Sequence, residues 1–79
     1  MWTVYVLECA DGTFYTGIAK DFEARLKAHT DGKGAKYTQG RGPFQIHHTE
    51  IHSSRSEASK REWQIKQLKR SEKVALGGR

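Results

Sequence analysis

The sequence has a single cysteine, a single proline and no long apolar run. A lone Cys9 excludes an intrachain disulfide and suits a reducing compartment, so we expect a cytoplasmic protein in which Cys9 is buried filler, not a nucleophile. No stretch approaches the roughly 18 apolar residues that a membrane-spanning helix requires. The N-terminus lacks a basic region and Glu8 interrupts its apolar residues, which argues against a signal peptide and against a membrane partner.

Apolar residues are also scarce. The 79 residues are 35% hydrophobic, and a chain of this size buries only about 60–65% of the surface of its unfolded form. We therefore expect one domain over residues 1–79, with a core of one thin layer. An open surface site that acts on a polymer suits such a domain better than a deep, closed pocket for a small molecule.

Positive charge is present in excess, with 14 Lys and Arg against 9 Asp and Glu, a net charge of +5. Small basic domains most often bind phosphate backbones, so nucleic acid is the expected partner. Residues 32–42 form a loop with four glycines, the basic residues Lys33, Lys36 and Arg41, and no acid. Its spacing matches neither the P-loop nor the dinucleotide fingerprint, so no nucleotide cofactor is indicated. The loop is predicted to contact phosphates with Tyr37 available for stacking; a solvated, mobile connector is the alternative.

Two short apolar strands, residues 2–8 and a second beginning at residue 14, open the chain, and each carries a tyrosine. A two-residue turn at Asp11-Gly12 would place Tyr5 and Tyr15 on opposite faces. A three-residue loop over residues 10–12, with Gly12 left-handed, places the two tyrosines on one face, with Cβ atoms about 7–8 Å apart and open space at Gly17. We prefer this second register because it collects a better core on the other face, made of Val4, Val6, Phe14, Thr16 and Ile18.

A helix is predicted over residues 21–30, with Asp21 as its N-cap and an end at Gly32. Its periodicity places Arg25 and His29 one turn apart on nearly the same face. A third strand is predicted over residues 44–51.

Three histidines, His47, His48 and His52, lie on or just after that third strand. Adjacent strand residues point to opposite faces, and no cysteine lies near enough to complete a ligand set, so we expect surface histidines and no zinc site.

Capping-box spacing at residues 54–57 predicts a helix that runs to about Arg70, followed by a short helix capped by Ser71 and ending at Gly77-Gly78. Glu62 lies about 60° from Ile65, at the border of the buried face. The simplest interpretation is an ion pair with Lys66 one turn on. Trp63 falls on the opposite side of the helix, where the sequence does not show what would cover it.

The order of these elements, with these residues at these places, resembles the GIY-YIG nuclease superfamily. It is most similar to the small stand-alone bacterial members of that superfamily, most of which are uncharacterised. The similarity covers Trp2 to about Leu76. The two triplets that name the family correspond to Thr3-Val4-Tyr5, which keeps only its tyrosine, and to Tyr15-Thr16-Gly17. The residues Arg25, His29, Tyr37 and Glu62 also fall where the family has its functional residues.

The resemblance implies an α+β fold with a small three-stranded antiparallel sheet flanked by helices, in the order β-β-α-β-α and a short last helix. It also implies hydrolysis of phosphodiester bonds with one divalent ion, Mg²⁺ or Mn²⁺, on DNA more than RNA. We expect low sequence specificity, or a partner protein that supplies targeting. A non-catalytic nucleic-acid-binding module with the same fold is the main alternative, and a domain that binds only proteins is a third.

The resemblance also implies a role for each matching residue. Glu62 would ligate the metal, Arg25 would bind the scissile phosphate, and Tyr5 or Tyr15 would deprotonate or orient the attacking water. A free tyrosine, with a pKa near 10, is only about 0.1% ionised at pH 7, so a base role needs a nearby cation. Assisting roles are expected for His29 and Tyr37, and nucleic-acid contacts for Lys33, Lys36, Arg41 and Lys66.

Overall fold

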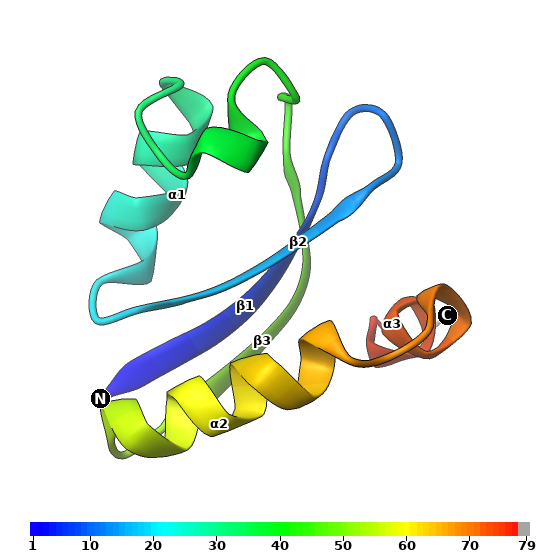
Figure 1. Ribbon diagram of the computed structural model, residues 1–79. Coiled ribbons are helices and arrows are strands. Elements are labelled where there is room, and N and C mark those ends of the chain that lie inside the picture. The colour runs from blue at the N-terminus through cyan, green and yellow to red at the C-terminus, as the bar shows by residue number, and fades with distance from the viewer. Residues whose placement is uncertain (78–79) are drawn as a thin grey trace.

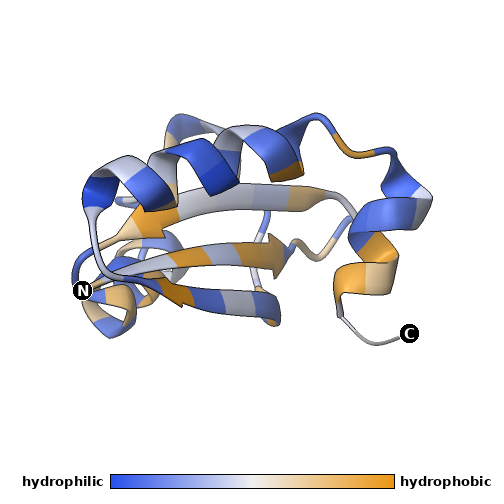
Figure 2. Ribbon diagram, turned by 90° about the horizontal axis from the view of Figure 1, so that it is seen from below, coloured by the Kyte–Doolittle hydropathy of each residue, from blue (hydrophilic) through white to orange (hydrophobic). Residues whose placement is uncertain are grey.

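The computed structural model describes residues 1–77, and seven elements follow one another along them. They are β1 (Trp2–Glu8), β2 (Phe14–Ala19), α1 (Phe22–Thr30), the 3₁₀ helix η1 (Lys36–Thr38), β3 (Gln45–His52), α2 (Arg55–Lys66) and α3 (Arg70–Leu76). The strands form one antiparallel sheet in the order β2-β1-β3. α1 and η1 lie on one side of the sheet, and α2 and α3 lie on the other (Figures 1 and 2). This is the predicted α+β fold. None of the helices in this region is long and apolar enough to cross a membrane.

The turn between β1 and β2 is the three-residue loop that the sequence predicts. Gly12 has φ of 83°, and its N–H donates to the Cys9 carbonyl at 2.9 Å. The Cys9 N–H donates to the Thr13 carbonyl at 2.8 Å, which closes the loop one residue earlier than a two-residue turn would. Asp11 supports the turn, because its carboxylate accepts hydrogen bonds from the amide and the hydroxyl of Thr13.

The hairpin register follows from this turn and is also as predicted. Tyr5 lies opposite Gly17, and Leu7 lies opposite Tyr15. The two tyrosines therefore share one face of the sheet, with ring centroids 6.3 Å apart.

The core has two layers, so the prediction of one thin layer is wrong. Successive residues of β1 point to opposite faces, and both faces of this central strand are covered by helices. On the side of α2 the buried cluster is Val4, Val6, Ala58 and Ile65. On the side of α1 it is Tyr5, Leu7 and Ala19, with Phe22 and Leu26 of α1 packed against it. Cys9 is buried, as predicted.

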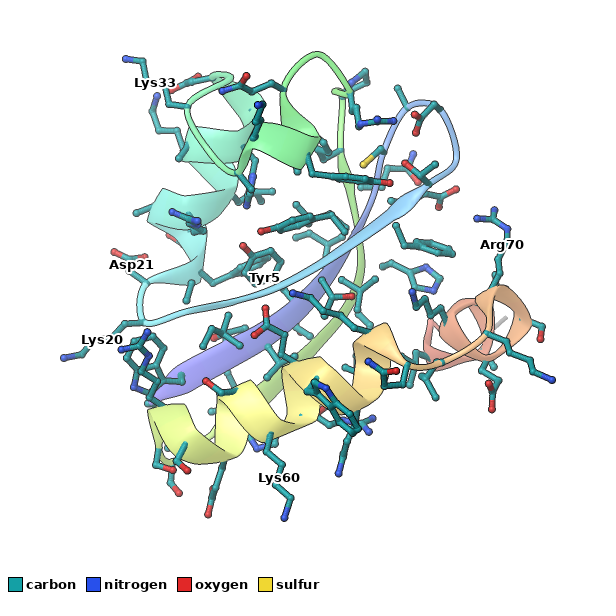
Figure 3. All side chains as sticks on the ribbon, viewed as in Figure 1. Tyr5, Lys20, Asp21, Lys33, Lys60 and Arg70 are labelled. Atoms are coloured by element: carbon teal, nitrogen blue, oxygen red, sulfur yellow. The ribbon has the colours of Figure 1, made fainter. Side chains whose placement is uncertain are left out.

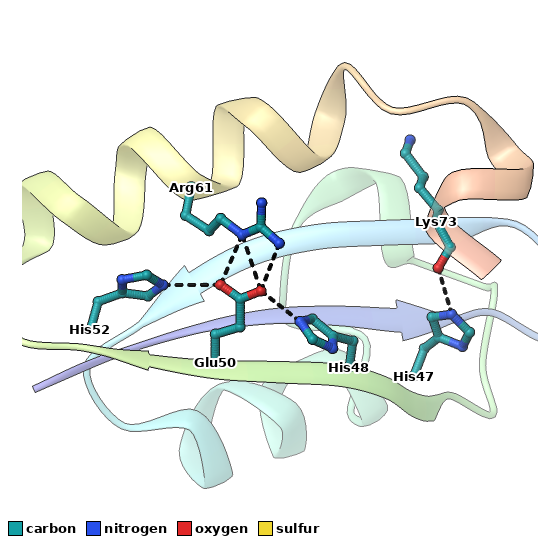
Figure 4. A network of polar contacts seen from close by, with 6 residues as sticks. All are labelled: His47, His48, Glu50, His52, Arg61 and Lys73. Carbon is teal, nitrogen blue, oxygen red and sulfur yellow. Dashed lines mark hydrogen bonds and ion pairs between the residues drawn. The ribbon is translucent and has the colours of Figure 1, made fainter. Parts of the chain in front are cut away.

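β3 contains an irregularity that the sequence does not predict. Val6 lies opposite His48 while the next residue of β1, Leu7, lies opposite Ile46, so His47 is an extra residue in β3. An inserted residue breaks the alternation of side chains. His47 and His48 consequently both point toward the helices α2 and α3 (Figure 4), and the prediction that they point to opposite faces is wrong.

The predicted caps of the first two helices are confirmed. The side chains of Asp21 and Ser54 accept hydrogen bonds from the amides of Ala24 and Glu57, each at 3.2 Å.

The last two helices differ from their predicted bounds. α2 ends at Lys66 instead of about Arg70, because Leu68 turns inward and packs against the core cluster of α2. α3 begins at Arg70 with Lys69 as its N-cap, so Ser71 is not the cap. Gly77 is the C-cap of α3, and the predicted end at Gly78 lies outside the described residues.

Candidate active site

Tyr5 lies at the centre of the α1 side of the sheet and is 1% exposed (Figure 3). Its ring leans across β2 onto Gly17, where an added Cβ would lie 2.6 Å from the Tyr5 hydroxyl. The expected open space at Gly17 is therefore filled by the tyrosine itself. Glycine at this position leaves room for the hydroxyl of Tyr5 over β2.

The hydroxyl of Tyr5 is the first group in a buried chain of hydrogen bonds. Tyr5 Oη lies 2.9 Å from His29 Nε2, and His29 Nδ1 lies 2.8 Å from Thr38 Oγ1. The Thr38 hydroxyl donates its only proton to the Ala35 carbonyl at 2.7 Å, so it accepts from His29. His29 therefore carries its proton on Nδ1, and its Nε2 accepts the hydrogen bond that Tyr5 donates. This order is assigned from the hydrogen-bond pattern, since each hydroxyl has one proton to give.

Burial keeps both partners neutral near pH 7. The pKa of Tyr5 is raised mainly by desolvation, and the Arg25 guanidinium beside the hydroxyl opposes this shift only in part. The pKa of His29 is lowered, first by desolvation and then by the charge of Arg25. Deprotonation of Tyr5 by His29 is disfavoured by both shifts. The pair therefore acts as a fixed, neutral support instead of a ready acid and base.

Tyr15 and Tyr37 form a stacked pair beside this support. Their ring centroids are 5.9 Å apart with an interplanar angle of 25°, and Tyr15 also contacts the edge of the His29 ring at 5.2 Å. Unlike Tyr5, both rings line a cleft of about 280 Å³ that runs along β2. The cleft is lined by Phe14, Tyr15, Thr16, Tyr37, Lys66 and Lys73.

Arg41 fixes the position of Tyr37. Its guanidinium pairs with the Asp11 carboxylate of the β1–β2 turn, lies 4.5 Å from the centre of the Tyr37 ring, and donates from Nε to the Tyr37 carbonyl at 2.7 Å. The Arg41 carbonyl in turn accepts from the Ala10 amide. These contacts fix this end of the loop to the hairpin, and the Arg41 guanidinium interacts with groups of the protein itself.

The other two basic residues of the loop, Lys33 and Lys36, do not line the cleft. Lys33 extends outward, away from Tyr5 (Figure 3), and the structure does not bring it to the cleft. Lys36 is exposed on η1, directly before Tyr37.

Arg25 on α1 and Glu62 on α2 lie on opposite sides of the sheet (Figure 1), and both influence the pKa of Tyr5. Arg25 is exposed on α1, and its positive charge lowers the pKa of Tyr5 against the larger effect of burial. Glu62 is half-buried on α2, and its negative charge raises the same pKa. The two side chains are 37 positions apart in the sequence, and the fold brings both within electrostatic range of one hydroxyl.

Glu62 is the one predicted metal ligand, and its chemistry fits a single Mg²⁺ or Mn²⁺. Its carboxylate is a hard oxygen donor with 23% of its side chain exposed, and its ion-pair partner Lys66 lines the cleft. It also pairs with Lys66 at 3.2 Å, as the simplest interpretation of the sequence predicts. Within residues 1–77 no group of three or more His, Cys, Asp or Glu could hold a metal. The site therefore suits an ion that keeps several waters and takes further ligands from a substrate phosphate.

The sequence gives no indication of two residues that support this region, Thr38 and Gly34. Thr38 completes the chain of hydrogen bonds to His29, yet a threonine in a glycine-rich loop carries no local pattern that predicts this. Gly34 lets the backbone approach the imidazole, because an added Cβ would clash with His29 Nδ1.

Glu50 is the centre of a second polar cluster, on the α2 side of β3 (Figure 4). Its carboxylate accepts hydrogen bonds from Arg61 at 2.9–3.0 Å and pairs with His48 and His52. These bonds, the Arg61 bond above all, lower the pKa of Glu50 to about 2. The histidines are half-buried and bonded instead of free on the surface. The cluster fastens α2 to the sheet and lies on the other face from Tyr5.

Comparison with known proteins identifies a matching family and two solved structures with a similar fold. Residues 1–75 match the family described as the GIY-YIG catalytic domain. A UPF0213 protein of Halobacterium salinarum is 54% identical over 76 residues, which are 96% of this chain and 99% of that protein. The solution NMR structure of the UPF0213 protein BH0048 from Bacillus halodurans is 48% identical, with a TM-score of 0.61 over 96% of this chain and 82% of that one. The solution NMR structure of the protein EF2693 from E. faecalis is 44% identical, with a TM-score of 0.64 over 92% of this chain and 78% of that one.

Proposed function

The chain belongs to the GIY-YIG catalytic domain family, and from this premise we propose that it is a nuclease that hydrolyses DNA phosphodiester bonds with one divalent ion. The observation that carries the proposal is that the charges of Arg25 and Glu62 both act on Tyr5, whose ring neighbours Tyr15 of the cleft. A cation for the phosphate, a carboxylate for a metal and a hydroxyl for the water are the groups that this hydrolysis needs.

Arg25 binds the scissile phosphate in this proposal. A phosphodiester resists nucleophiles because it is negatively charged, and its oxygens gain charge as the water attacks. The exposed guanidinium of Arg25 can donate two parallel hydrogen bonds to those oxygens. Lys66 and Lys73, which line the same cleft, add positive charge along the path of the strand.

Glu62 holds the divalent ion, which supplies Lewis-acid stabilisation of the charge on the phosphate oxygens when it is bound. To take this role, the carboxylate would give up its ion pair with Lys66. A surface pair of this kind is worth only a few tenths of a kcal/mol, so its loss costs little.

Tyr15 is the hydroxyl that contacts the attacking water. It lines the cleft, whereas Tyr5 is 1% exposed and its hydroxyl already donates a hydrogen bond to His29. In this role the hydroxyl of Tyr15 orients the attacking water by a hydrogen bond. Tyr5 and His29 are positioning residues, because their rings contact the ring of Tyr15 and hold it in place.

The decisive experiment separates a nuclease from a binding module. Purified protein is incubated with single-stranded, duplex and branched DNA and with RNA, over a range of Mg²⁺ and Mn²⁺ concentrations. A nuclease yields products that EDTA abolishes and that Arg25→Ala and Glu62→Ala lose. Steeply salt-dependent DNA binding that EDTA leaves unchanged, with no product at any metal concentration, would instead establish a non-catalytic module.

A further inference from the structure

Trp63 is a large aromatic side chain that the fold does not use. It is 63% exposed, although it lies on α2, whose opposite side carries the buried Ala58 and Ile65. An exposed tryptophan on a small domain is uncommon, because burying it is worth several kcal/mol.

The helix face around Trp63 is basic, although Lys66 at its border pairs with Glu62 at 3.2 Å. At 100° per residue, Lys60 and Lys66 lie about 60° to either side of Trp63. The two acidic residues of α2, Glu57 and Glu62, lie about 120° and 100° away on the same count. Trp63 is thus an aromatic surface between two lysines, with small or neutral polar residues, Ser56, Ser59 and Gln67, filling the rest of the face.

Lys66 connects this face to the cleft. It lines the cleft together with Tyr15 and Tyr37, and it lies one turn along α2 from Trp63. A continuous series of aromatic and basic side chains therefore leads from the stacked tyrosines, past Lys66, to Trp63. Aromatic rings alternating with lysines are the surface that a flexible nucleic-acid strand recognises, since bases stack on the rings and phosphates pair with the cations.

We propose that Trp63, flanked by Lys60 and Lys66, is a stacking platform for an unpaired base in a single-stranded segment of the DNA that enters the cleft. The inference rests on the proposed nuclease function and specifies its substrate. Inside a duplex both faces of a base are covered by its neighbours, so a side chain on the protein surface can stack only on a base that is unpaired. The preferred substrates are therefore single strands, overhangs and flaps.

Tryptophan fluorescence reads this contact directly, because the chain has two tryptophans. Trp2→Phe leaves Trp63 as the sole tryptophan, and Trp63→Phe leaves Trp2, which is half-buried beneath the Arg55 guanidinium. Each variant is titrated in EDTA, which prevents cleavage, with single-stranded DNA of about 12 nucleotides and with a dumbbell duplex whose ends are closed. We expect strong quenching only for Trp2→Phe with the single strand.

Affinity gives an independent measure. Trp63→Ala should weaken single-strand binding about fivefold or more and leave duplex binding within about twofold, whereas Trp63→Phe should retain most of the affinity because phenylalanine also stacks. Gln64→Ala, at an exposed neighbouring position of α2, is the matched control and should change neither.

Two results would overturn the inference: Trp63 emission unaltered by saturating single strand, or equal losses of single-strand and duplex affinity in Trp63→Ala. Neither depends on catalysis. The proposed function fails separately, if no metal-dependent cleavage is found while these binding results hold.

Discussion

The hydroxyl of Tyr5 donates a hydrogen bond to Nε2 of His29 at 2.9 Å, in the buried interior between β1 and α1. The pairing joins a residue of the first strand to one 24 positions later. It also fixes the imidazole in one tautomer, because Thr38 can only accept from Nδ1. Tyr15, which we assign to the water, packs against both rings.

The first prediction concerns the protonation of His29. Nitrogen-15 NMR of the histidine side chains should show His29 with its proton on Nδ1 and none on Nε2 at pH 7. A proton on Nε2 would reverse the direction of the hydrogen bond from Tyr5 and remove the assigned order.

A separate prediction for His29 is that the protein loses stability in mild acid. Its pKa is lowered from the ordinary 6.5 by burial and by Arg25, so below pH 6.5 the unfolded chain binds this proton and the folded chain does not. The free energy of unfolding should fall as the pH drops from about 6.5 to the folded pKa. His29→Gln removes this titration. The difference in the free energy of unfolding between wild type and His29→Gln, measured by urea unfolding, should therefore change over this pH window and stay constant at higher pH.

A second prediction tests the close approach of Tyr5 to Gly17. Gly17→Ala places a methyl group 2.6 Å from the Tyr5 hydroxyl, and we expect a loss of about 1–3 kcal/mol in the free energy of unfolding. Tyr5→Phe removes the hydroxyl oxygen but keeps the ring carbon Cζ, which lies 2.7 Å from the added methyl group, so Gly17→Ala should cost less in that background without becoming neutral. Strict additivity of the two changes in a double-mutant cycle would show that the two groups do not meet.

A third prediction concerns Glu50, whose pKa is lowered to about 2, chiefly by Arg61. A carboxylate with a lowered pKa stabilises the fold above its unfolded pKa of about 4.5, and this stabilisation is lost as the pH falls toward 2. Glu50→Gln should lower the free energy of unfolding by about 1–3 kcal/mol at pH 7. The deficit should shrink between pH 4.5 and 2, while the exposed control Glu57→Gln should show little deficit at either pH. A deficit for Glu50→Gln that is the same at pH 7 and pH 2 would contradict the ionic role.

A fourth prediction concerns the basic loop. Asp11→Asn weakens the hold on Arg41 and through it on Tyr37, so amide hydrogens of residues 32–42 and of Ala10 should exchange faster, while those of α2 should not. Asp31→Asn, which breaks the exposed pair with Lys27, is the matched control. Equal exchange in wild type and Asp11→Asn would show that the pair does not order the loop.

The hairpin could be predicted because its information is local. Gly12 in a three-residue loop fixes the register, and the register fixes the faces of Tyr5 and Tyr15. The helix caps at Asp21 and Ser54 are local in the same way, since each side chain bonds an amide three residues on.

The errors arise where distant residues decide the conformation. The extra residue His47 depends on how β3 pairs with β1, and no glycine or proline marks it. α2 ends early because Leu68 reaches the core, although the sequence there consists of good helix formers. The hydrogen bond from His29 to Thr38 crosses a loop whose course the sequence does not define. In each case the local preference is weak and the tertiary contact prevails.

The most direct test of the account is nicking of supercoiled plasmid in Mg²⁺ by wild type, Glu62→Gln and Glu57→Gln prepared in parallel. Both substitutions remove one carboxylate from α2, but only Glu62 lies within electrostatic range of Tyr5. We expect wild type and Glu57→Gln to nick at similar rates, and Glu62→Gln to lose at least about 100-fold, the effect of removing one principal electrostatic group from such a site. Nicking by Glu62→Gln at the wild-type rate would contradict the assignment of the active site.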